Sequence, residues 1–193
     1  GKLTPGRFEI AGNVSSQYIT GLLLALPILD GDSEIVLTTE LQSKPYVDMT
    51  VKVMADFGVK VEERENSYFV PGNQVYQKRD YTVEADWSQA AFFMVAGALF
   101  GDVTLTGLDV NSTQGDKKIA DILKKFGADV AVSNDSVVVK KSQLQGIEIN
   151  ATDIPDMVPS LAVAGIYASG KTVITGAQRL RYKESDRIES IVY

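Results

Sequence analysis

The 193-residue sequence contains no cysteine and no histidine. Without cysteine the chain can form no disulfide framework and no thiolate metal site, and it has no thiol nucleophile. Without histidine it lacks the commonest general base and a common metal ligand. Any acid–base chemistry must therefore use Asp, Glu, Lys or Tyr.

The sequence also lacks a long apolar run and a basic charge balance. No stretch approaches the roughly 18 apolar residues of a membrane-spanning helix, and the N-terminus has no signal-peptide organisation. A formal charge of −6 argues against generic nucleic-acid binding, which needs a basic surface. With 45% apolar residues, the composition is that of a globular protein. We expect a cytoplasmic protein that binds neither membranes nor nucleic acid.

What the sequence does contain is an internal repeat of about 70 residues. Glycines that lead into β-branched runs recur at Gly31, Gly101 and Gly170, 70 and 69 residues apart. A Phe-Gly pair, typical of a helix C-cap, recurs at residues 57–58 and 126–127. Each repeat predicts an apolar helix, a strand, an amphipathic helix and a pair of strands.

The first helix of each repeat is unusually apolar. The segments Tyr18–Leu29, Ala90–Phe100 and Met157–Tyr167 are apolar nearly all round. Because such helices bury every side, we expect an α/β fold with the helices inside and the sheets outside. We place a domain boundary near residue 84, giving two incomplete domains, 1–83 and 84–193. Since the chain stops inside a helical pattern, we expect an excised piece whose third repeat is truncated.

The stretch Arg179–Arg187 concentrates four cations and two carboxylates in nine residues. We predict that it opens a helix, on which Lys183 and Arg187 form an i,i+4 pair with Glu184 beside them. Like charges on one helix face are unfavourable unless an anion lies over them. A solvated, salt-bridged helix face is the alternative interpretation.

Three further motifs stand at predicted helix starts. Ser15-Ser16-Gln17 supplies an N-cap and, with the free helical N–H groups, a candidate anion site. Ser43-Lys-Pro-Tyr46 opens the next helix, where Pro is favoured and Tyr46 is either a surface or a core residue. Asp156 begins the third apolar helix, either as a dipole-stabilising carboxylate or as a general base.

One motif is a false match. Residues 165–172 fit the phosphate-binding pattern G-x-x-x-x-G-K-[ST] completely. That loop functions only between a strand and a helix, whereas here an apolar helix precedes it and a β-branched run follows. We therefore reject a nucleotide site.

The motifs occur in a fixed order that covers the chain. They read S-S-Q from Ser15, S-K-P-Y-V-D from Ser43, V-E-A-D-W-S from Val83, N-S-T-Q-G-D from Asn111, D-I-P-D from Asp153 and L-R-Y-K-E-S-D-R from Leu180. This order resembles the 5-enolpyruvylshikimate-3-phosphate synthase (3-phosphoshikimate 1-carboxyvinyltransferase) family. The resemblance implies two domains, each of three βαβαββ units with helices inside. It also implies transfer of the enolpyruvyl group of phosphoenolpyruvate to the 5-hydroxyl of shikimate 3-phosphate, without a metal or organic cofactor.

The resemblance carries roles to individual residues. Ser15, Ser16, Gln17, Ser43 and Tyr46 would hold shikimate 3-phosphate, and Gln17 would also contact phosphoenolpyruvate. Asp156 would accept the proton of the 5-hydroxyl, and Lys183 would contact the shikimate hydroxyls. Glu184 would serve in proton transfer to the methylene carbon, and Arg187 would bind the phosphoenolpyruvate anion.

The chain also departs from the family pattern. Many members have Asn four residues before the motif lysine, where this chain has Arg179. The family's N-terminal Lys, Ser and Arg, its Gly-rich phosphoenolpyruvate loop and its C-terminal Arg and Lys are absent, so we expect little or no turnover by this chain alone. The alternatives are the enolpyruvyl transferase that acts on UDP-N-acetylglucosamine and a non-catalytic scaffold. We expect a monomer.

Overall fold

The computed structural model describes residues 2–134 and 136–192, which form two compact units. The units are Gly1–Thr82 and Val83–Tyr193. The sequence-predicted boundary was drawn between residues 83 and 84. Each unit has its own cluster of buried apolar side chains, and none of the described residues belongs to both clusters.

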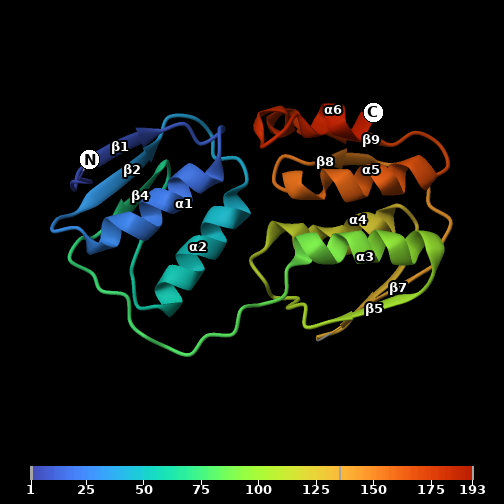
Figure 1. Ribbon diagram of the computed structural model, residues 1–193, viewed down its shortest axis with the longest axis horizontal. Coiled ribbons are helices and arrows are strands. Elements are labelled where there is room, and N and C mark those ends of the chain that lie inside the picture. The colour runs from blue at the N-terminus through green and yellow to red at the C-terminus, as the bar shows by residue number, and fades with distance from the viewer. Residues whose placement is uncertain (1, 135, 193) are drawn as a thin grey trace. The chain divides into compact units, whose positions relative to one another are not determined.

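The first unit is one βαβαββ repeat. Its elements are β1 (Arg7–Ile10), α1 (Ser16–Ala25) with a 3-10 turn η1 (Leu26–Ile28), β2 (Ser33–Leu37), α2 (Lys44–Asp56), β3 (Glu62–Arg64) and β4 (Ser67–Val70). The sheet order is β1-β2-β4-β3, in which β1 and β2 are parallel and the other neighbours antiparallel. Helices α1 and α2 lie side by side against this sheet (Figure 1).

The second unit begins at the helix of the repeat and then follows the same order of elements. They are α3 (Trp87–Phe100), β5 (Val103–Thr106), a 3-10 turn η2 (Gly115–Lys118), α4 (Ile119–Lys125), β6 (Asp129–Val132) and β7 (Ser136–Lys140). The sheet order β5-β7-β6 reproduces β2-β4-β3 of the first unit. The predicted repeat is thus confirmed at the level of strand topology.

A third repeat follows and is shorter. Its elements are β8 (Glu148–Asn150), a 3-10 turn η3 (Pro155–Met157), α5 (Val158–Tyr167), β9 (Val173–Thr175), a 3-10 turn η4 (Gln178–Tyr182) and α6 (Arg187–Val192). Strands β8 and β9 are parallel and are joined through α5, as β1 and β2 are joined through α1. Because α5 precedes and β9 follows residues 168–172, the rejection of a phosphate-binding loop is confirmed.

Equivalent residues close equivalent turns in the repeats. Gly58 and Gly127 follow α2 and α4 with φ of 81° and 92°, the left-handed conformation that makes glycine the favoured residue at this position. Asp32 Oδ1 accepts a hydrogen bond of 2.9 Å from the backbone N–H of Gly72, and Asp102 Oδ1 one of 3.2 Å from Lys141. Both aspartates hold the chain where it leaves the last strand of the repeat.

The expectation that the first helices are buried on every side was wrong. Helix α3 buries Trp87, Met94 and Ala98, but Phe93 and Phe100 remain 60% and 62% exposed. Exposed apolar side chains also form one stripe along α1 and another along α5. They are Tyr18, Leu24 and Ile28 in the first unit and Val163, Ile166 and Tyr167 in the second. The described residues of each unit cover one face of these helices and leave the other open.

Candidate functional site

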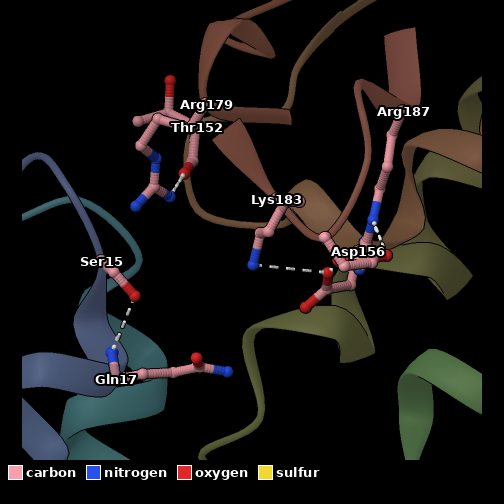
Figure 2. A network of polar contacts seen from close by, with 8 residues as sticks. Ser15, Gln17, Thr152, Asp156, Arg179, Lys183 and Arg187 are labelled. Carbon is pink, nitrogen blue, oxygen red and sulfur yellow. Dashed lines mark hydrogen bonds and ion pairs between the residues drawn. The ribbon is translucent and has the colours of Figure 1, made fainter. Parts of the chain in front are cut away.

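In the first unit, the first candidate residues lie at the start of α1. Ser15 is the N-cap, with extended backbone, and its Oγ accepts a 3.3 Å hydrogen bond from the N–H of Gln17. This confirms the predicted cap. Ser16 is half-buried, and Gln17 is exposed. The cap hydroxyl thus fixes the first turn, while the amide of Gln17 is presented to solvent (Figure 2).

The start of α2 contributes Ser43 and Tyr46. Ser43 is only 2% exposed and has a left-handed backbone with φ of 57°. This conformation costs free energy for a residue other than glycine, so the surrounding structure must enforce it. The N–H of Tyr46 donates to the carbonyl of Ser43 over 3.1 Å, and Tyr46 is half-buried.

Lys44, which sequence reasoning left without a role, holds this helix start to the sheet. Its Nζ lies 2.5 Å from Asp48 Oδ1 on the same helix and 3.1 Å from Glu63 Oε1 on β3. Burial lowers the pKa of Lys44, but the hydrogen bonds and charges of the two carboxylates outweigh it and raise the pKa above its ordinary value. The i,i+4 spacing of Lys44 and Asp48 was a signal available in the sequence.

The second unit brings the predicted residues of the third repeat together around one carboxylate. Asp156 lies in η3, and its Oδ1 accepts a 2.8 Å hydrogen bond from Arg187 Nη1. Lys183 Nζ lies 3.9 Å from the same oxygen (Figure 2). Arg187 also binds Glu184 through two hydrogen bonds, Nε to Oε1 at 2.8 Å and Nη2 to Oε2 at 3.0 Å. The guanidinium thus bridges two carboxylates that come from different elements.

The predicted helix over Arg179–Arg187 was wrong. Residues 178–182 form the 3-10 turn η4, Lys183 is extended, and α6 begins only at Arg187. Asp186 decides where the helix starts, because its Oδ1 accepts from the N–H of Glu189 at 3.0 Å, as an N-cap does. Lys183 and Arg187 are therefore brought together by a bend in the chain, and Asp156 is the anion placed between them.

Hydrogen bonds shift the pKa values of Glu184, Asp186 and Arg187. The bonds from Arg187 hold the pKa of the exposed Glu184 carboxyl below its ordinary value, and the same bonds raise the pKa of Arg187. The backbone N–H of Glu189, followed by Arg181, lowers the pKa of Asp186. The carboxylates of Glu184 and Asp186 therefore stay ionised at neutral pH.

Arg179 contacts the loop that carries Asp156. Its Nη2 donates to the backbone carbonyl of Thr152 over 3.2 Å, and the residue is half-buried (Figure 2). Sequence reasoning could not find this contact, because a backbone carbonyl leaves no signature in the residue types.

Two features are absent from the part of the chain that the structure describes. Among those residues no group of three or more acidic side chains could hold a metal ion. None of their helices is both long and apolar enough to cross a bilayer.

Repeated βαβαββ units with Ser, Gln, Lys and Arg side chains at helix starts, and a carboxylate between two cations, define an α/β protein of the enolpyruvyl transferase type. The family described as EPSP synthase (3-phosphoshikimate 1-carboxyvinyltransferase) matches residues 2–193. The chain belongs to this family.

Similar proteins are longer than this chain. A 3-phosphoshikimate 1-carboxyvinyltransferase of Clostridium novyi is 50% identical over 192 residues, which cover 99% of this chain and 44% of that protein. The Methanocaldococcus jannaschii protein of the same name is 43% identical, covering 98% of this chain and 45% of its own length. The chain thus spans less than half of these relatives.

Solved structures show the same fold. An EPSP synthase from Acinetobacter baumannii matches with a TM-score of 0.76 and 29% identity, over 99% of this chain and 44% of that one. The enolpyruvyl transferase NikO from Streptomyces tendae matches with a TM-score of 0.70 over 90% of this chain and 44% of its own. At 23% identity, the latter likeness shows the fold alone.

Proposed function

We propose that this chain is part of a 3-phosphoshikimate 1-carboxyvinyltransferase. The reaction transfers the enolpyruvyl group of phosphoenolpyruvate to the 5-hydroxyl of shikimate 3-phosphate, through a tetrahedral intermediate, and releases phosphate. It belongs to aromatic amino acid biosynthesis by way of chorismate. The observation that carries the proposal is the cluster of Asp156, Lys183, Glu184 and Arg187, in a chain that the family matches from end to end.

In the second unit the proposed roles follow from the charge of each side chain and from its contacts. The carboxylate of Asp156 is held in place by Arg187, and as a general base it accepts the proton of the 5-hydroxyl. Lys183 stands over the same carboxylate and donates to substrate hydroxyls. Arg187 offers the planar donor fork that suits the phosphoenolpyruvate anion. Glu184 is 66% exposed, beside Arg187, and passes a proton to the methylene carbon.

In the first unit the proposed roles are binding roles. Ser15, Ser16 and Gln17 lie at the start of α1, where helical N–H groups and dipole favour a phosphate. Ser43 and Tyr46 lie at the start of α2 and complete the shikimate 3-phosphate site, and Gln17 also contacts phosphoenolpyruvate. The predicted monomeric state and cytoplasmic localisation stay predictions.

The UDP-N-acetylglucosamine enolpyruvyl transferase is the competing activity. The motifs S-K-P-Y-V-D from Ser43 and D-I-P-D from Asp153 favour the shikimate branch. The family match and the names of the similar proteins support the same choice.

The test grafts this chain, in place of the aligned 192 residues, into the Clostridium novyi relative and measures phosphate release from phosphoenolpyruvate. We expect turnover that depends on shikimate 3-phosphate and is absent with UDP-N-acetylglucosamine. Asp156→Asn should lower kcat by about 10² to 10⁴. Asp153→Asn is the matched control, because Asp153 is about half exposed and its ion pair with Lys118 is long, at 3.8 Å. It should leave kcat unchanged.

The isolated chain serves as the second arm of this test. Calorimetry should detect binding of shikimate 3-phosphate and none of the UDP-sugar, with little or no phosphate release. An inactive hybrid, or a chain that binds only the UDP-sugar, contradicts the proposal.

A further inference from the structure

The loop formed by residues 151–156, which runs from the end of β8 into η3, carries Asp156 and is ordered partly by short-range hydrogen bonds. Asn150 Oδ1 accepts from both the N–H and the Oγ1 of Thr152, at 3.0 and 2.7 Å. The N–H of Ile154 donates to the carbonyl of Ala151, and that of Met157 to the carbonyl of Ile154, each over 3.1 Å. These bonds form a chain of turns from the end of β8 to the residue next to Asp156.

The segment after β9 has an anchor of its own in the core of the second unit. Leu180 is 0% exposed and packs in the core of the second unit. This buried side chain fixes η4, the turn that also carries Arg179. Gly176 precedes this segment with φ of 73°, and a Cβ there would lie 2.3 Å from Thr152 Oγ1. The backbone at Gly176 therefore lies directly against the loop, and no larger residue fits.

Two arginines that follow β9, Arg179 and Arg187, contact the loop near its start and at its end. Arg179 Nη2 donates to the carbonyl of Thr152 at 3.2 Å, and Arg187 Nη1 donates to the carboxylate of Asp156 at 2.8 Å. The residues contacted are four apart in the chain, and so the loop is held on both sides of Ile154. A bond from a cation to a carbonyl is stronger than one between neutral groups.

We propose that Arg179 is a positioning residue, which holds the loop so that Asp156 stays between Lys183 and Arg187. In this chain Arg179 acts on the reaction through the carbonyl of Thr152 and makes no contact with substrate. The inference rests on the proposed function for the role of Asp156. The effect of Arg179 on the opening of the loop can be measured without any enzyme activity.

The first experiment measures amide hydrogen exchange by NMR in the 193-residue chain. In Arg179→Met, the amides of Ile154 and Met157 should exchange about five- to tenfold faster, because the loop opens more often. Arg179→Lys keeps one cationic donor and should return the rates to within about twofold of the native chain. The buried amide of Val139 on β7 reports on global stability and should not change.

The matched control is Lys118→Met. Lys118 Nζ lies 3.8 Å from Asp153 Oδ2 on the same loop, with both side chains about half exposed. An exposed pair at this distance contributes little, so the exchange rates of Ile154 and Met157 should stay the same. If Arg179→Met also accelerates the amide exchange of Val139, the comparison uses Arg179→Gln instead of Arg179→Met. Glutamine keeps a polar but shorter side chain.

The second experiment places Arg179→Met and Arg179→Lys in the hybrid enzyme described above. A positioning residue predicts a kcat lowered about tenfold, an unchanged KM for shikimate 3-phosphate, and recovery of kcat with lysine. A raised KM with unchanged kcat makes Arg179 a substrate ligand and overturns the proposal. The proposal is also overturned if the exchange rates of Ile154 and Met157 do not change in Arg179→Met, or if Arg179→Lys does not restore them. A native hybrid without activity instead refutes the proposed function, and the exchange rates still decide whether Arg179 holds the loop.

Discussion

At the scale of single residues, Arg187 is the centre of the charged cluster. Its guanidinium binds Asp156 from η3 and Glu184 from its own segment, so one cation orients two carboxylates with different proposed tasks. An anionic substrate that binds Arg187 must compete with these carboxylates for the donor fork. The carboxylate of Asp156 lies between Lys183 and Arg187 and offsets the repulsion between these two cations.

This arrangement predicts how Glu184 titrates. Arg187 lowers the pKa of Glu184 from an ordinary 4.5, so the pair stabilises the folded segment above that pH and stops doing so as the pH falls through the lowered pKa. Arg187→Met should return the pKa of Glu184 toward 4.5, as measured by ¹³C NMR of the side-chain carboxyl. Arg181→Met is the control, because Arg181 pairs with Asp186 at 2.7 Å and should leave Glu184 unchanged. Equal titration of Glu184 in the native chain and in Arg187→Met would refute the assignment.

Sequence alone predicted the members of this cluster but not its geometry. The sequence predicted that 179–187 opens a helix, and only the structure shows that Asp186 caps a later one. The sequence did indicate that Lys183 and Arg187 need an anion nearby. That Asp156 supplies it depends on the fold of η3 against η4, which no local pattern encodes.

At the scale of elements, the repeat was predictable because its signals are local. Glycines after helices and β-branched runs have strong conformational preferences, and these predicted the ends of α2 and α4 and the positions of β2, β5 and β9. The open faces of α1, α3 and α5 were not predictable, because hydrophobic periodicity reports what a side chain prefers and not what covers it. Phe100 and Tyr167, for example, meet edge-to-face at 5.5 Å, yet both remain more than half exposed.

The two faces of α3 should respond differently to truncation. Met94 is 0% exposed, and Met94→Ala should lower the free energy of unfolding of the second unit by about 2–5 kcal/mol through the cavity it leaves. Phe93, its neighbour, is 60% exposed, and Phe93→Ala should cost less than about 1 kcal/mol although it removes a larger side chain. Urea unfolding followed by the fluorescence of Trp87 measures both. A larger loss for Phe93→Ala would mean that its face of α3 is covered in solution.

At the scale of the whole molecule, the chain is organised as two cores linked by an irregular segment. Residues 71–86 contain no helix or strand, and their first part belongs to the first unit. Gln74 Oε1 accepts from the N–H of Lys60 at 2.7 Å, and Arg79 donates to the carbonyl of Asp56. The irregular segment is thus fastened to the first unit at least as far as Arg79, and the second unit begins at Val83.

Separate cores predict separate unfolding, since each unit has the buried apolar side chains that a domain needs. The single tryptophan of the sequence, Trp87, lies buried in the second unit, so its fluorescence reports on that unit, whereas circular dichroism reports on both. Leu23→Ala removes a side chain that is 0% exposed in the first core and should shift part of the circular dichroism transition but leave the fluorescence midpoint unchanged. Leu161→Ala, equally buried in the second core, should shift the fluorescence midpoint. A single transition that both substitutions move together would show that the two cores unfold as one cooperative unit, because independent domains respond only to changes in their own core.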